Sequence, residues 1–189
     1  MVAGLFLDDY DLRINSYNML KHEITTSTSS MTSIPRPLKF IRTHFSEIKE
    51  FYDKYNPSND KDKNYKLMLS DLLSVILTVI NEKEDGKELT ILSYVLSGTK
   101  KDITSWGQEY IRSLCSDIGQ EYSQRMDKDE PSNDLLELVK IIAPYLIKQH
   151  CESDAIDLLI AMCLYILQYL LNNLLLIINI NIFFYNYSH

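Results

Sequence analysis

The stretch YKLMLSDLLSVILTVI, residues 65–80, decides the fold class because it is apolar on almost every side. The piece VILTV within it would suit a strand, but sixteen residues without a Gly or Pro breaker favour a helix by length. A helix that is apolar all round is buried by its neighbours. We therefore expect a central helix here, with other helices packed around it.

Two amphipathic helices are predicted before this stretch. Apolar residues recur at spacings of three and four between residues 8 and 24 and again between residues 38 and 55. The first stripe is Ile14, Tyr17, Leu20 and Ile24, and the second is Leu38, Ile41, Phe45, Ile48, Tyr52 and Tyr55. This spacing is typical of helices that bury one face. The Asn, Pro, Ser and Asp residues of 55–64 then indicate a loop.

A run of hydroxyl residues separates these two helices. Eight of the nine residues from Thr25 to Ser33 carry a hydroxyl group, and such side chains compete for backbone hydrogen bonds. We expect the run to end the first helix. Pro35 and Pro37 then form a rigid elbow, with Pro37 in the first turn of the next helix. Phosphorylation of the run stays open.

Further helices are predicted after the central stretch. We expect a turn at 81–88, a short helix at 89–96 that ends at Gly98, and a helix capped by Asp102 or Thr104 that carries Trp106 and Tyr110. After a linker at 125–134, a helix from Leu135 should bend or break after Ile142 because Pro144 follows. Ser153 should cap a last segment. The prediction is an all-α array of about seven antiparallel helices, similar to a helical repeat, without a sheet.

Composition and charge favour a protein that binds other proteins. The 189 residues carry a formal net charge of −7, whereas nucleic-acid binding needs clustered Lys and Arg. The three cysteines, Cys115, Cys151 and Cys163, are an odd number without zinc spacing, and we find no secretory signal before them. We expect thiols in a reducing compartment, no metal and no cofactor.

The C-terminal end differs in composition from the rest. From Leu158 to Ile182 the chain is rich in Leu and Ile for 25 residues, long enough to span a bilayer, yet it also carries several Asn residues. Three interpretations stay open: a translation or gene-model artefact, a membrane anchor, and a buried helix. We place a helical domain at 8–157 and a hydrophobic tail at 158–189.

The sequence contains no catalytic motif. Phosphate-binding glycine loops, the G-x-S-x-G elbow and H-E-x-x-H are all absent, and Cys115 and Cys151 occupy helical positions typical of core or boundary thiols. Trp106 and Tyr110, four residues apart, could stack a ligand or pack on a neighbouring helix. Arg36, Trp106 and Tyr110 are the candidate partner contacts, since aromatic and Arg residues dominate binding energy at interfaces.

Four blocks of this sequence occur in register with the predicted helices: TTSTSSMTSIPRPLKFIRTHFSEIKEFYDKY (25–55), DLLSVILTV (71–79), YVLSGTKKDITSWGQEYIRSLCSDIGQEY (94–122) and LLELVKIIAPYLIKQHCESDAIDLLI (135–160). Together they resemble the large non-ATPase subunit of the proteasome regulatory-particle base. The resemblance extends from about residue 10 to 160 and covers the N-terminal helical region of a much longer protein. The chain departs from the family pattern after residue 159, which suggests a fragment or a truncated gene model.

The resemblance implies a noncatalytic scaffold subunit that supports ATP-dependent degradation of ubiquitinated proteins in cytoplasm and nucleus. It implies other regulatory-particle subunits as partners, especially the base ATPases, whereas the family's sites for ubiquitin and shuttle factors lie outside this chain. The alternative from a different class is a small tail-anchored membrane protein with a cytosolic helical domain.

Overall fold

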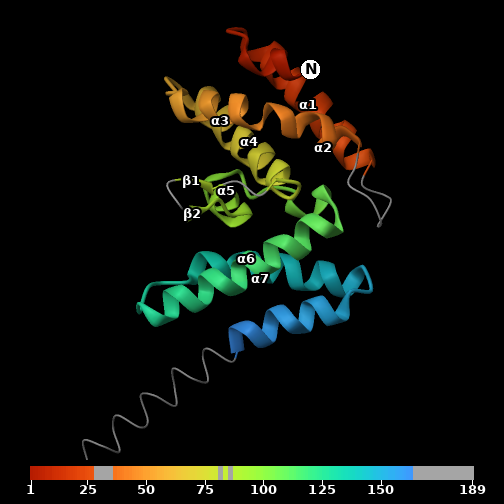
Figure 1. Ribbon diagram of the computed structural model, residues 1–189, viewed down its shortest axis with the longest axis vertical. Helices are drawn as coiled ribbons and strands as arrows, with labels where there is room; N and C mark the ends of the chain where they lie inside the picture. Colours follow the sequence, from red (N-terminus) through yellow and green to blue (C-terminus); the bar gives the residue numbers. More distant parts are fainter. Residues whose placement is uncertain (28–35, 81–82, 85–86, 164–189) are drawn as a thin grey trace, which may run out of the picture. The chain divides into compact units, whose positions relative to one another are not determined.

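The chain folds as an array of helices, which confirms the predicted all-α class (Figure 1). The computed structural model describes residues 1–27, 36–80, 83–84 and 87–163. Within these ranges the helices are η1 (Val2–Phe6), α1 (Tyr10–Ser27), α2 (Arg36–Ile41), η2 (Arg42–His44), α3 (Phe45–Lys54), α4 (Asp60–Leu77), α5 (Ile91–Ser97), η3 (Ile103–Trp106), α6 (Gln108–Asp127), α7 (Asn133–Lys148) and a last helical segment at 152–163. The chain divides into two compact units, Met1–Asp117 and Ile118–His189.

Helix α4 is the centre of the first unit, as the sequence predicts. Ten of its residues are buried, and it packs against α1, α3 and α5. The helix begins at Asp60, inside the predicted loop, because the Asn59 side chain accepts a hydrogen bond from the Asp62 backbone N–H at 2.9 Å. This cap places the first turn of α4, and Asp62 with it, beside the end of α3.

The helix predicted at 38–55 is divided by a short 3₁₀ turn, η2, into α2 and α3. Leu38, Ile41, Phe45 and Ile48 are buried, so the predicted apolar stripe continues through the turn. Pro37 occupies the first turn of α2 as expected. The rest of the predicted elbow, including Pro35, lies outside the described residues.

The described part of helix α1 ends at Ser27, inside the hydroxyl run that we expected to end it. The Thr25 and Thr26 hydroxyls donate to the carbonyls of Lys21 and His22, at 2.9 and 2.7 Å. These side chains bond back onto the helix instead of capping it. The remainder of the run, residues 28–33, lies outside the described residues.

The predicted turn at 81–88 contains a minimal antiparallel ladder, which the sequence did not indicate. Strand β1 (Lys83–Glu84) pairs with β2 (Lys87–Glu88), with Lys83 opposite Glu88 and Glu84 opposite Lys87. Two residues per strand do not form a layer of the fold. Helix α5 then ends at Ser97, and Gly98 follows as its C-cap with φ −93° and ψ −168°.

The predicted cap of the next helix is wrong. Asp102 precedes the 3₁₀ turn η3 without a side-chain capping bond, and Thr104 lies within that turn. Helix α6 begins later, at Gln108, after Gly107 with φ 103°. Only glycine adopts such a conformation without strain, so Gly107 separates the two elements.

Helix α7 runs without a break from Asn133 to Lys148, with Pro144 inside it. Of the bend or break expected after Ile142, the break is therefore wrong, and the bend stays a prediction. Its apolar face is buried along the whole length, through Leu135, Leu138, Val139, Ile142, Ala143 and Leu146. This packing offsets the hydrogen bond that Pro144 cannot donate. Ser153 lies inside the last helical segment, which starts at residue 152, so it does not cap it.

The last helical segment crosses the boundary expected at residue 157, and Leu158 and Met162 on it are buried. The rest of the predicted tail, residues 164–189, lies outside the described part of the chain. Among the residues whose positions are described, no helix combines the length and apolar character needed to cross a bilayer.

Candidate functional site

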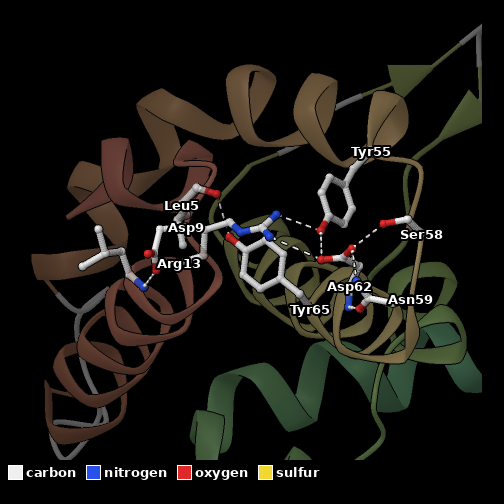
Figure 2. A network of polar contacts seen from close by, with 9 residues as sticks. Leu5, Asp9, Arg13, Tyr55, Ser58, Asn59, Asp62 and Tyr65 are labelled. Carbon is white, nitrogen blue, oxygen red and sulfur yellow. Dashed lines mark hydrogen bonds and ion pairs between the residues drawn. The ribbon is translucent and has the colours of Figure 1, made fainter.

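A buried arginine joins α1 to the α3–α4 pair (Figure 2). Arg13 on α1 is 7% exposed, although a charged side chain is almost never buried without partners. Its guanidinium donates to the Tyr55 hydroxyl at 2.7 Å and forms an ion pair with Asp62 at 3.3 Å. The partners lie on the loop after α3 and in the first turn of α4. Arg13 therefore connects segments that are distant in the sequence.

Asp62 is the acceptor at the centre of this network. Its carboxylate accepts from the hydroxyls of Tyr55 and Ser58, each at 2.8 Å, and from the Asn59 amide at 2.9 Å. These hydrogen bonds, that from Tyr55 first, lower the pKa of Asp62, and the nearby Arg13 charge acts in the same direction. The carboxylate is fully engaged and thus unsuited to act as a general base.

Aromatic rings surround the same guanidinium. The Arg13 guanidinium carbon lies 4.9 Å from the Tyr65 ring centroid, 5.3 Å from that of Tyr55 and 5.9 Å from that of Tyr10. These distances are typical of cation–π interactions. The Tyr65 hydroxyl donates to the Leu5 carbonyl at 2.7 Å, which fastens η1 to α4, and burial raises the pKa of Tyr65. Among the described residues, Arg13 Nε is buried and has no hydrogen-bond partner.

A second carboxylate, which is buried, connects α4 to the loop after α5. Asp71 accepts hydrogen bonds from the Thr99 backbone N–H at 3.0 Å and from the Thr99 hydroxyl at 2.5 Å. Gly98 makes room for it, since a Cβ atom at this position would lie 2.1 Å from Asp71 Oδ1. Burial raises the pKa of the Asp71 carboxyl, while the Thr99 hydrogen bonds and the Lys21 ammonium oppose this effect.

Hydroxyl groups extend this second network into the core. The Ser74 hydroxyl lies 3.0 Å from the Tyr110 hydroxyl and 2.6 Å from the Asp71 carbonyl, to which it donates. Burial raises the pKa values of Tyr110 and Tyr17. A phenol that resists ionisation is a hydrogen-bonding core group rather than an acid or base at neutral pH. Both networks are therefore built to hold helices together.

The structure separates the three predicted contact residues by exposure. Arg36 is exposed at the start of α2, whereas Trp106 and Tyr110 are only 3% and 4% exposed in the core of the first unit. The Lys21 ammonium lies 5.4 Å from the Trp106 ring centroid. Contacts of these residues with a partner remain a prediction, and of the three side chains only that of Arg36 is accessible in this chain.

The sequence analysis missed Arg13 and Asp71. Arg13 precedes Tyr17, Leu20 and Ile24 at the spacing of the buried stripe, which was the available signal. Asp71 lies in the apolar stretch 65–80, where an acid needs a partner. In both cases the interacting groups come from other elements, so local spacing does not identify them.

The three thiols differ in exposure. Cys151 is buried, Cys115 is half-buried and Cys163 is exposed. Within the described ranges, no three His, Cys, Asp or Glu side chains are placed to hold a metal ion. The features that the structure offers are thus helix surfaces and structural networks.

The amino-acid sequence of this chain is similar to those of known proteins. Residues 1–173 match the model of the RPN1 N-terminal domain. The chain is 38% identical over 159 residues to the 26S proteasome regulatory subunit rpn-1 of Neurospora crassa, which covers 84% of this chain and 17% of that protein. It is 40% identical over 149 residues to the 26S proteasome non-ATPase regulatory subunit 2 homolog A of Arabidopsis thaliana, with 79% of this chain and 16% of that protein covered.

The same similarity extends to the 26S proteasome regulatory subunit rpn1 of Schizosaccharomyces pombe, at 39% identity over 145 residues, 77% of this chain and 15% of that protein. The chain thus spans about one sixth of the length of the curated relatives it matches. The family match covers most of the chain and includes both networks described above. The chain belongs to the family of the RPN1 N-terminal domain.

Proposed function

We propose that this chain is a noncatalytic scaffold that supports ubiquitin-dependent protein degradation by binding other subunits of the proteasome regulatory particle. The observation that carries the proposal is its similarity, at 38–40% identity, to proteins named as 26S proteasome regulatory and non-ATPase subunits. The base ATPases are the expected partners, and cytoplasm and nucleus the expected compartments.

The chemistry of the interior supports binding rather than catalysis. Asp62 and Asp71, the carboxylates of the two networks, are held by hydrogen bonds from neighbouring side chains and backbone. Tyr17, Tyr65 and Tyr110 have raised pKa values because they are buried. A catalytic site would need an acid, base or nucleophile that reaches a substrate. These groups instead rigidify the helices whose outer faces a partner would meet.

Affinity purification tests this proposal. The tagged 189-residue chain should recover regulatory-particle subunits from cells in the presence of ATP, with the ATPases enriched over proteins of similar abundance. A matched control is Ile111→Asp, which places a charge at a fully buried position and should unfold the first unit. Recovery of no regulatory-particle subunit by the intact chain would refute the proposal, as would equal recovery by the Ile111→Asp variant.

A further inference from the structure

One segment of this chain carries positive charge without any acidic residue. No Asp or Glu occurs between Glu23 and Glu47, although the chain has 26 acidic residues in total. Arg36, Lys39 and Arg42 fall in this interval and are exposed. Within the described part of the chain, none of these three side chains forms an ion pair. They present an uncompensated basic surface on a protein of net charge −7.

An aromatic side chain lies among these charges. Phe40 is 75% exposed, more than any other large hydrophobic residue among those described. Arg36, Lys39 and Phe40 share one face of α2 because they are three and four residues apart. The opposite face carries Leu38 and Ile41, which are buried, and α2 packs on α1. Core contacts therefore hold the helix with Phe40 directed outward.

This arrangement has the composition of a binding anchor. Aromatic and Arg residues dominate the energy of protein interfaces, and an apolar side chain exposed to this degree gains free energy when a partner covers it. The cations add attraction to an acidic partner and set its orientation. We propose that this surface binds an acidic protein segment whose apolar side chains contact the phenylalanine ring. We call it the Phe40 surface, and it consists of Arg36, Lys39, Phe40 and Arg42.

A protein partner fits this surface better than a membrane or a nucleic acid. Interfacial membrane helices bury a long apolar face, whereas α2 has six residues and a single large exposed apolar side chain. Phosphate-rich polymers would be repelled by the excess of acids elsewhere in the chain. A short acidic helix matches both the size and the charge of the surface. The inference rests on the proposed scaffold function and names the chemistry of one partner.

Isothermal titration calorimetry tests the inference with a synthetic amphipathic helix that carries leucine on one face and glutamate elsewhere. The intact chain should bind this peptide, and binding should weaken as salt is added. Phe40→Ala should weaken binding about tenfold, as should the combined Arg36→Glu, Lys39→Glu and Arg42→Glu changes.

Each test variant has a matched control. The control for Phe40→Ala is Ile147→Ala, at a residue 53% exposed on α7. The control for the triple change is combined Lys128→Glu, Lys140→Glu and Lys148→Glu, which shifts the net charge by the same amount.

Three results would overturn the inference. The first is no binding of the glutamate peptide by the intact chain, or equal binding of a peptide with lysine in place of glutamate. The second is equal weakening by control and test variants. The third is binding to phosphatidylserine vesicles that is lost in the Phe40 surface variants while peptide binding is not.

The two proposals fail separately. Absence of regulatory-particle subunits from the purified intact chain overturns the scaffold function. Their undiminished recovery with Phe40→Ala overturns the Phe40 surface alone.

Discussion

Gly98 is a residue at which the fold leaves no room for a side chain. A Cβ atom there would lie 2.1 Å from Asp71 Oδ1 and 3.1 Å from the Tyr94 carbonyl oxygen. The carboxylate would have to move and give up its hydrogen bonds to Thr99, leaving a buried charge less well paired. Gly98→Ala should therefore lower the free energy of unfolding by about 2 kcal/mol, measured by urea denaturation.

Gly119 provides the matched control for this change. A Cβ atom on Gly119 would meet the Ala161 Cβ at 3.7 Å, an ordinary contact, and the position is inside α6. Alanine is the better helix former, so Gly119→Ala should raise the free energy of unfolding by up to about 1 kcal/mol. Equal stability of the two variants would contradict the steric role of Gly98.

Asp71 gives the stability of the protein a defined dependence on pH. Its folded pKa is raised by burial, so its contribution to the free energy of unfolding is fully present below the unfolded pKa of about 3.9. That contribution is lost as the pH rises through the folded pKa. Asp71→Asn should remove this loss, so the variant should gain stability relative to the intact protein as the pH rises.

Urea denaturation at a series of pH values from 4 upward measures this difference. Asp60→Asn is the control, because the Asp60 side chain is 98% exposed at the start of α4. If Asp71→Asn instead became less stable relative to the intact protein as the pH rises, the predicted sign of the effect would be wrong.

Single buried charges are the part of the site that sequence reasoning could not supply. Arg13 follows the helical spacing of a buried residue, but its partners Tyr55 and Asp62 come 42 and 49 residues later. Asp71 likewise depends on Thr99, 28 residues further on. Trp106 and Tyr110 were named as candidate contacts from residue type, and the structure places both side chains in the core.

At the scale of elements, Arg13 couples α1 to the α3–α4 pair. Arg13→Ala would remove two polar contacts and leave three tyrosine rings without their central cation. We expect a loss of about 2 kcal/mol in the free energy of unfolding, measured by urea denaturation. Arg112→Ala, at a side chain 44% exposed with an i,i+3 partner, should change stability by less than about 0.5 kcal/mol. Losses of equal size would argue against the coupling role.

Pro144 is a second test at this scale. Proline inside a helix forfeits a backbone hydrogen bond, and α7 continues through it because its apolar face is buried. Pro144→Ala should restore the bond to the Lys140 carbonyl and raise the free energy of unfolding by about 1–3 kcal/mol, visible as a higher Tm. Pro131→Ala, in the exposed linker before α7, should instead be neutral or slightly destabilising. A lower Tm for Pro144→Ala would mean that the proline is accommodated without cost.

The helices themselves were largely predictable, whereas their boundaries were not. Periodic apolar stripes identified α1, α6 and α7 because one buried face is encoded locally, and the length of an almost wholly apolar stretch identified α4. The start of α4 depends on the Asn59 cap, and the start of α6 on the conformation of Gly107. The passage of α7 through Pro144 depends on tertiary packing, which a rule about proline alone does not contain.

At the scale of the whole molecule, net charge determines how solubility depends on pH. The formal net charge is −7 at pH 7 and falls to zero near the pI of about 5.1. Charge repulsion between molecules then no longer opposes their association through exposed apolar residues such as Phe40 and Ile160. Light scattering should show the lowest solubility near pH 5, with recovery on either side of it. A solubility that falls steadily from pH 8 to pH 4 would instead indicate acid unfolding.

One of the matching blocks that made family membership visible in the sequence carries residues of the core. The block SWGQEY (105–110) contains the buried Trp106 and Tyr110 together with Gly107, whose positive φ separates η3 from α6. Residues of this kind are constrained by packing and backbone conformation at once. The division into two units at Asp117 was not predictable, since it falls inside α6, where the helical period is unbroken.

The buried Trp106 side chain is an intrinsic fluorescence probe of unfolding. It is the single tryptophan of the chain, and it lies 3% exposed in the unit Met1–Asp117. Its fluorescence emission therefore reports the unfolding of that unit and does not directly report the unfolding of the helices after Asp117. A mismatch between fluorescence and circular dichroism midpoints would reveal, without any label, that the two units lose their structure at different temperatures.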